Sequence, residues 1–263
     1  MSRATTTRTV GDQITTLLTR FTLTTAAREM VSRFVHADQQ PALPLLLEVL
    51  ELEAQERHER RIMRLRRASK LPPGKTFDTL DEGRLPPALV RRLHELVDGD
   101  FLADATNVLA FGLPGVGKSH AICAVGHALV DRGHAVLFMP TYSLVQELLA
   151  AKRNLELPRA LRKLDAFAVL ILDDVGYIQQ SPEEAEILFT LLAERYERRS
   201  VFITSNLIFA NWDRIFRDQM ATAAAIDRLV HHSVLLEFDV SSFRTEHAKR
   251  RGKTTPPRTE AAS

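Results

Sequence analysis

Eight consecutive residues, Gly112 to Ser119, have the types and spacing needed to bind the phosphates of a nucleotide. They read Gly-Leu-Pro-Gly-Val-Gly-Lys-Ser and match G-x-x-x-x-G-K-[S/T] at every fixed position. The glycines let successive backbone N–H groups turn toward a phosphate, and the positive end of a following helix points at the same charge. Lys118 can reach the β and γ phosphates, and the Ser119 hydroxyl can ligate Mg²⁺. The nucleotide-binding residues predicted here are Gly112, Pro114, Gly115, Val116, Gly117, Lys118, Ser119 and His120.

Two adjacent carboxylates could complete this chemistry. Asp173 and Asp174 directly follow an apolar run at 169–172. In P-loop enzymes the first acid of such a pair serves the Mg²⁺ ion and the next orients or deprotonates the attacking water, so we assign these roles to Asp173 and Asp174 respectively. Asn206 follows another apolar run, and ligands bind outside the carboxyl ends of parallel strands, so Asn206 could face the γ-phosphate. A turn-capping role is the alternative for Asn206.

Five short apolar runs are the elements that must position these residues. Segments with helical periodicity separate the runs, which is the arrangement of a buried parallel sheet. The first run leads directly into the phosphate loop and a helix-compatible run follows it, as such a loop requires. The pattern predicts an α/β fold with a parallel sheet flanked by helices. The expected strands are 108–111, 135–139, 168–172, 201–204 and 234–238.

A helical segment with a basic end precedes the nucleotide-binding part. Periodicity predicts short helices near 14–21 and 26–35 and a long helix over 45–68. The stretch 57–70 holds seven Lys or Arg residues against one Glu. Because arginine makes bidentate contacts with phosphate, a nucleic-acid backbone is one reading of this stretch, and a solvated face paired with neighbouring acids is the equal alternative. The arginines spaced along one side of the helix are Arg57, Arg60, Arg61, Arg64 and Arg67.

Helix breakers and composition divide the chain into three parts. The residues at 71–74, Leu-Pro-Pro-Gly, end the long helix, so we expect a helical N-terminal domain over 1–70, a core over 71–240 and a basic tail over 241–263. With 45% apolar residues and one cysteine, the chain fits an intracellular protein without disulfides. No apolar run is long enough to span a membrane, so we expect a cytoplasmic protein with no membrane partner.

Several motifs occur along the chain in a recognisable order. They are the phosphate loop, the Asp173-Asp174 pair, Arg195-Tyr196-Glu197-Arg198-Arg199, Thr204-Ser205-Asn206, Asn211-Trp212 and Ile226-Asp227-Arg228-Leu229-Val230-His231-His232. In this combination they resemble IstB-type proteins, the AAA+ ATPases that help the transposases of insertion sequences and are related to the DnaC and DnaI helicase loaders. The resemblance covers roughly residues 45–251.

The resemblance implies specific roles. It implies an AAA+ fold with ATP and Mg²⁺ as cofactors, Asp173-Asp174 as the Walker B pair and Asn206 as sensor 1. It also implies that Arg228 is an arginine finger, which would stabilise charge on the phosphoryl group transferred in a neighbouring subunit. An ion pair of Arg228 with Asp227 or a nearby acid of the same chain is the alternative.

The leading hypothesis is an ATP-dependent protein that assembles on double-stranded DNA as a homo-oligomer, in a ring or a helical filament, and helps a cognate transposase to select its target. A DnaC-like helicase loader is the second hypothesis, and a small-molecule P-loop kinase is the third.

Several other residues carry narrower expectations. Few residues follow the last expected strand, so we expect a reduced or absent lid, with Arg244 as the candidate sensor 2 arginine. Phe77 could pack on the base or in the core. We expect Cys123 and Trp212 to pack in the core, and no metal at His231-His232, because no Cys or acid lies at a matching spacing.

Overall fold

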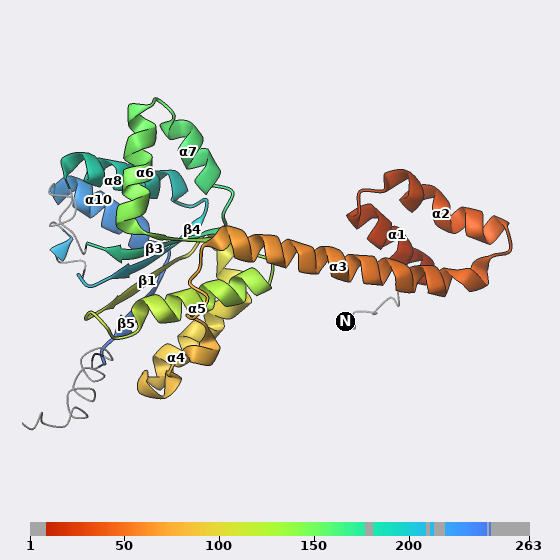
Figure 1. Cartoon of the computed structure of the whole chain (residues 1–263), viewed down its shortest axis with the longest axis horizontal. Coiled ribbons are helices and arrows are strands. Elements are labelled where there is room, and N and C mark those ends of the chain that lie inside the picture. Colours follow the sequence, from red (N-terminus) through yellow and green to blue (C-terminus); the bar gives the residue numbers. More distant parts are fainter. Residues whose placement is uncertain (1–8, 177–180, 209–210, 213–218, 241, 243–263) are drawn as a thin grey trace, which may run out of the picture. The chain divides into compact units, whose positions relative to one another are not determined.

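The computed structural model divides the chain into two compact units, residues 1–64 and 65–263. The division falls within helix α3 (Leu43–Ser69), whereas the boundary expected from the sequence falls at the end of that helix. Of the expected tail only Ser242 is described, so Arg244 lies outside the described residues. The backbone of 219–225 is described, but of its side chains only that of Ala223 is. The structure describes residues 9–176, 181–208, 211–212, 219–240 and 242, and Figure 1 labels their helices and strands.

The N-terminal unit consists of helices packed around three buried side chains. Helix α1 (Val10–Arg20) begins at a capping box in which Thr9 and Asp12 exchange hydrogen bonds. Helix α2 (Thr24–His36) and a short 3₁₀ turn (Gln40–Ala42) lead into α3. The predicted helices are confirmed. Helices α2 and α3 extend beyond their expected ranges by one or two residues at each end, whereas α1 begins four residues earlier than expected and ends one residue earlier, at Arg20. The buried side chains at the centre are Ile14, Leu18 and Leu43.

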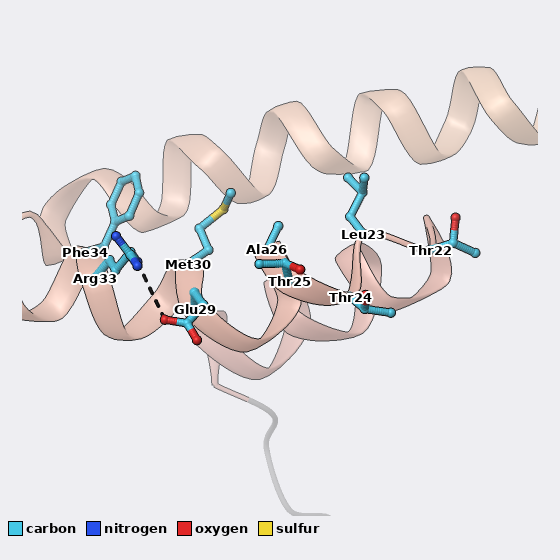
Figure 2. A pocket seen from close by; sticks show the side chains of 9 residues that line it. All are labelled: Thr22, Leu23, Thr24, Thr25, Ala26, Glu29, Met30, Arg33 and Phe34. Carbon is cyan, nitrogen blue, oxygen red and sulfur yellow. Dashed lines mark ion pairs between the residues drawn. The ribbon is translucent and has the colours of Figure 1, made fainter.

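A hollow of about 680 Å³ lies on the surface of this unit, along α2 and the turn before it. Figure 2 shows that its lining consists of threonine, aliphatic and aromatic side chains together with Glu29 and Arg33, which form an ion pair at 3.7 Å. Because Glu29 balances the only cation among these lining residues, the hollow does not present converging positive charge to a phosphate. The lining residues are Thr22, Leu23, Thr24, Thr25, Ala26, Glu29, Met30, Arg33 and Phe34.

The second unit is built on a parallel five-stranded sheet with the strand order β2-β3-β4-β1-β5. Because β1 lies between β4 and β5, the loop that follows β1 lies beside the end of β4, and β3 lies one strand further away. Each of the five predicted apolar runs is a strand, so the predicted fold is confirmed. The strands are β1 (Asn107–Gly112), β2 (Val136–Pro140), β3 (Val169–Val175), β4 (Ser200–Ser205) and β5 (Ser233–Phe238).

Helices cover both faces of this sheet (Figure 1). Val108 and Ala110 of β1 pack with α4 and α5, whereas Leu109 and Phe111 pack with α6, α7, α8 and α10. Burial on both faces explains why the strands read as continuous apolar runs. The helices are α4 (Pro87–Glu95), α5 (Lys118–Asp131), α6 (Thr141–Arg153), α7 (Leu157–Leu164), α8 (Pro182–Arg195) and α10 (Gln219–Val230), with 3₁₀ turns at Phe77–Thr79, Glu82–Arg84, Leu96–Asp98 and Asp100–Asp104.

The core also contains the two residues for which only packing was expected. Cys123 on α5 and Trp212 are both fully buried, and Trp212 donates a hydrogen bond from its indole N–H to the carbonyl of Leu207 at 3.1 Å. Both expectations are therefore confirmed. Within the described part of the chain, we find no helix with the length and apolarity that crossing a membrane requires.

Arg195, at the end of α8, hydrogen-bonds to backbone carbonyls at the amino edge of the sheet. Its side chain is 1% exposed, and its guanidinium donates hydrogen bonds to the carbonyls of Leu164, Phe167 and Ser200 at 3.0–3.1 Å. Burial lowers the pKa of Arg195 to about 10, against the opposing effect of Asp165, so the group remains charged at neutral pH. One buried cation thus joins the segment before β3 to the start of β4.

Candidate nucleotide-binding site

A cavity of about 660 Å³ opens at the carboxyl ends of β1, β3 and β4. This is the edge at which open parallel sheets bind their ligands. The phosphate loop, the end of β3, the residue after β4 and the segment 75–84 all contribute side chains. The lining residues are Lys75, Thr79, Leu80, Asp81, Arg84, Pro114, Gly115, Gly117, Lys118, Ser119, His120, Asp174 and Asn206.

The backbone of the phosphate loop requires glycine at two of its fixed positions. Gly117 has a φ of 101° and immediately precedes α5, which begins at Lys118. Gly112 has a φ of 153°, and a Cβ at this position would lie 2.6 Å from the carbonyl oxygen of Phe238. Between them, Val116 is fully buried in the core and anchors the loop. The loop therefore presents its backbone to the cavity while one side chain holds it to the sheet.

Lys118 joins the phosphate loop to β4. Its Nζ donates hydrogen bonds to the carbonyls of Gly112 at 2.7 Å and Leu113 at 2.9 Å, and to Oδ1 of Asn206 at 2.7 Å. The structure thus brings together two of the residues to which the sequence assigned catalytic roles. For the Asn206 side chain, no turn-capping hydrogen bond is present among the described residues.

Thr204 holds the two aspartates in different environments. Its Oγ1 donates to Oδ1 of Asp173 at 2.6 Å and accepts from the backbone N–H of Asp174 at 2.9 Å. Asp173 is 9% exposed and does not line the cavity, whereas Asp174 is exposed and does. The φ of Asp174 is 59°, a left-handed value that is rare for a non-glycine residue, at a bulge between Leu172 and Val175. The bulge turns the second carboxylate toward the cavity.

The segment 75–84 forms a wall of the cavity that the sequence patterns did not predict. His120 fastens this wall, because its Nε2 lies 3.0 Å from Oγ1 of Thr79 and 3.1 Å from the carbonyl oxygen of Thr76. Phe77 stacks on His94 with ring centroids 4.8 Å apart and packs against the core, so it is not one of the lining side chains. Of the two expectations for Phe77, core packing is the one observed.

Arg228 is not one of the described residues that line the cavity of its own chain. Its guanidinium lies over the ring of Phe189 on α8, 4.9 Å from the centroid, and one of its terminal nitrogens is buried with no hydrogen-bond partner among the described residues. Among the described residues, Arg228 forms no ion pair with Asp227 or with another acid. The alternative expected from the sequence, an ion pair within the chain, is therefore not observed in the described part.

The five arginines of α3 that the sequence singled out, Arg57, Arg60, Arg61, Arg64 and Arg67, are all exposed. Arg57 and Arg60 both pair with Glu53, and Arg57 also lies over the ring of Phe21 at 4.3 Å. Neighbouring acids thus balance these two cations, as expected if this side of the helix is a solvated face. Arg64 and Arg67 form no ion pair within the described residues.

Comparison with known proteins gives the family. A family model described as IstB-like ATP binding protein matches residues 16–251. A putative insertion sequence ATP-binding protein of Sinorhizobium fredii is 44% identical over 209 residues, which cover 79% of this chain and 70% of the relative. An insertion sequence putative ATP-binding protein of Pseudomonas aeruginosa is 38% identical over 206 residues, which cover 78% of each chain.

Solved structures agree with the fold. AMPPCP-bound DnaA from Aquifex aeolicus has a TM-score of 0.55 at 16% identity, over 74% of this chain and 59% of that chain. The DnaC helicase loader has a TM-score of 0.52 at 19% identity, over 64% of this chain and 98% of that chain. Together with the loop and sheet geometry, these matches identify the chain as a member of the IstB-like ATP-binding protein family, with the fold of an AAA+ P-loop ATPase.

Proposed function

We propose that this protein is a Mg²⁺-dependent ATPase that assembles on double-stranded DNA and helps the transposase of its insertion sequence to engage target DNA. The observation that carries the proposal is the cavity at the carboxyl edge of the sheet, where Lys118, Ser119, Asp174 and Asn206 converge. The family and the names of the relatives supply the insertion-sequence context.

Different residues of the chain bind the phosphates, hold Mg²⁺ and orient the attacking water. Backbone N–H groups of the loop and the start of α5 bind the phosphates, and Lys118 exchanges its carbonyl acceptors for phosphate oxygens. The Ser119 hydroxyl lines the cavity and would ligate Mg²⁺, and the carboxylate of Asp173, buried at the end of β3, would hold the hydration shell of the ion. When bound, the ion would neutralise charge on the phosphates. Asp174 orients the attacking water from the cavity wall, and Asn206 keeps Lys118 beside the γ-phosphate.

Arg228 acts on the site of a neighbouring copy. It is not among the described residues that line its own chain's cavity, and within the described part of the chain one of its buried nitrogens has no hydrogen-bond partner. A guanidinium supplied from another subunit would stabilise charge on the transferred phosphoryl group, which accelerates hydrolysis about 10³–10⁵-fold in well-studied cases. Turnover would then depend on assembly into a ring or a filament.

DNA binding in this proposal is mainly contact with phosphates. The exposed arginines Arg57, Arg60, Arg61, Arg64 and Arg67 are the candidate contacts. Because each neutralised phosphate releases counterions, affinity should fall linearly with salt on a log–log plot, and removing one contact should reduce the slope by about one unit. We expect Arg64→Ala and Arg67→Ala to reduce the slope more than Arg57→Ala, since Glu53 already balances Arg57. A salt-independent affinity would refute phosphate contact.

The enzymatic part is tested by steady-state ATP hydrolysis against protein concentration, with and without duplex DNA. The proposal expects activity per subunit to rise with concentration and with DNA, and Lys118→Ala to be inactive. Activity that is independent of both would favour a self-contained enzyme. Pull-down of the full chain with a replicative helicase rather than with the transposase would favour the loader hypothesis, for which the present support is similarity of fold alone.

A further inference from the structure

Three potential metal ligands meet at the amino edge of the sheet. Glu197 lies between the end of α8 and the start of β4, and His231 and His232 lie between the end of α10 and the start of β5. Parallel strands begin at the same edge, and β4 and β5 flank the same strand, β1. The cavity at the phosphate loop lies at the opposite, carboxyl edge. This cluster is therefore separate from the nucleotide-binding site.

The ligand atoms of the cluster lie somewhat further apart than those of a metal site with its ion bound. One potential ligand atom from each of the three side chains lies within 4.8 Å of the others, and all three residues are exposed. The two imidazole rings lie 4.4 Å apart, edge to face. In a tetrahedral zinc site the Zn–N and Zn–O bonds are about 2.0–2.2 Å, which places ligand atoms about 3.3–3.5 Å apart. Rotation of exposed side chains supplies the remaining movement.

The backbone holds the cluster from both sides. Glu197 has a left-handed φ of 56°, so it lies at a sharp turn of the backbone between α8 and β4. The carbonyl of His232 accepts a hydrogen bond from the backbone N–H of Asn107 at 2.7 Å, which fixes the second turn to the start of β1. The Tyr196 hydroxyl lies 3.4 Å from Nδ1 of His231 and also hydrogen-bonds with Glu197. Tyr196 thus touches two of the three ligands.

Neighbouring charges leave the carboxylate available. Arg198 pairs with Asp165 at 2.7 Å and with Glu194 at 3.4 Å, and in the described part of the chain Glu197 has no ion pair. Arg228 is directed to the ring of Phe189. A cation at this edge would therefore meet two imidazoles and a carboxylate that has no ion pair among the described residues.

We propose that Glu197, His231 and His232 bind a zinc ion that clips the α8–β4 turn to the α10–β5 turn. Two imidazole nitrogens and one carboxylate oxygen suit zinc far better than Mg²⁺, which prefers oxygen ligands throughout. The fourth position takes water. Arg228 lies three residues before His231, so the ion also fixes the end of the helix that carries this arginine. The sequence did not predict the site, because the carboxylate is distant along the chain from the histidine pair.

The test is calorimetric titration of the full-length, untagged chain with Zn²⁺ in excess Mg²⁺, without nucleotide. The Mg²⁺ occupies oxygen-rich sites and leaves the imidazoles free. We expect one zinc ion per chain and an affinity at least about tenfold weaker for His231→Ala, His232→Ala and Glu197→Gln. The matched control is His58→Ala, an exposed histidine on α3, which should leave the affinity unchanged.

A second measurement follows the thermal midpoint of unfolding. Zinc should raise the midpoint of the wild type and of His58→Ala, because a ligand that binds only the folded state stabilises it. At the same zinc concentration it should raise the midpoint of Glu197→Gln by clearly less, because that variant binds zinc more weakly. Equal zinc affinity in wild type and His231→Ala, or a zinc-dependent shift of undiminished size in all three cluster variants, would overturn the proposal.

Discussion

Replacement of Thr204 by valine would test the link between β4 and the paired aspartates. Thr204 is fully buried, and its hydroxyl both donates to Asp173 at 2.6 Å and serves the backbone N–H of Asp174 at 2.9 Å. Loss of a hydrogen bond to a carboxylate costs about 1.5–3 kcal/mol, and a buried N–H without a partner costs about 1–3 kcal/mol. Since one hydroxyl makes both bonds, the effects overlap, and we expect a loss of about 2–4 kcal/mol.

The assay is guanidinium chloride unfolding, with Thr204→Ser as the matched control. Serine keeps the hydroxyl and loses one methyl group, which costs about 1 kcal/mol. Thr204→Val should therefore unfold at a clearly lower denaturant concentration than Thr204→Ser. Its ATP turnover should fall about 10–100-fold, because Asp173 and Asp174 lose their orientation. Equal stability and equal turnover in the two variants would refute the reasoning.

Three further predictions use single side chains. Gly112→Ala places a Cβ against the carbonyl of Phe238, so it should lower the free energy of unfolding by about 1–3 kcal/mol and weaken ATP binding. Denaturant unfolding and nucleotide titration measure the two effects. Gly74→Ala is the control, since open space surrounds Gly74, and should change neither quantity. Arg195→Met leaves buried carbonyls without a donor and should lower the free energy of unfolding by about 3–5 kcal/mol; an unchanged unfolding midpoint would contradict this. Burial raises the pKa of the Cys123 thiol to about 12, above its ordinary value of 9.0. The unfolded chain therefore loses this proton first, so stability from this group is complete below pH 9 and declines as pH rises toward 12, and replacement by alanine should remove that part of the alkaline decline.

The sheet and the phosphate loop could be predicted because their signals are local. A strand buried on both faces requires an apolar run, and a backbone that wraps phosphate requires glycine at fixed positions such as Gly112 and Gly117. Asp173 and Asp174 could be found because they end such a run. Their different exposure could not be predicted, since it depends on a bulge and on a hydroxyl from another strand.

Long-range packing explains the remaining gaps. The segment 75–84 has no motif, and it reaches the cavity only because His120 binds Thr76 and Thr79 across more than forty residues of sequence. Glu197 reaches His231 only because the sheet order brings the starts of β4 and β5 to either side of β1. Such contacts depend on topology, which the pattern of apolar residues does not specify.

The most direct test of the central claim mixes two inactive variants. Lys118→Ala keeps Arg228 but lacks a competent phosphate site, and Arg228→Ala keeps the phosphate site but lacks the arginine. If Arg228 acts on a neighbouring copy, an equimolar mixture on duplex DNA should recover roughly a quarter of the wild-type ATPase rate, because about one in four head-to-tail contacts then joins an intact site to an intact arginine. A mixture as inactive as its components, or an Arg228→Ala protein with full activity alone, would contradict the account.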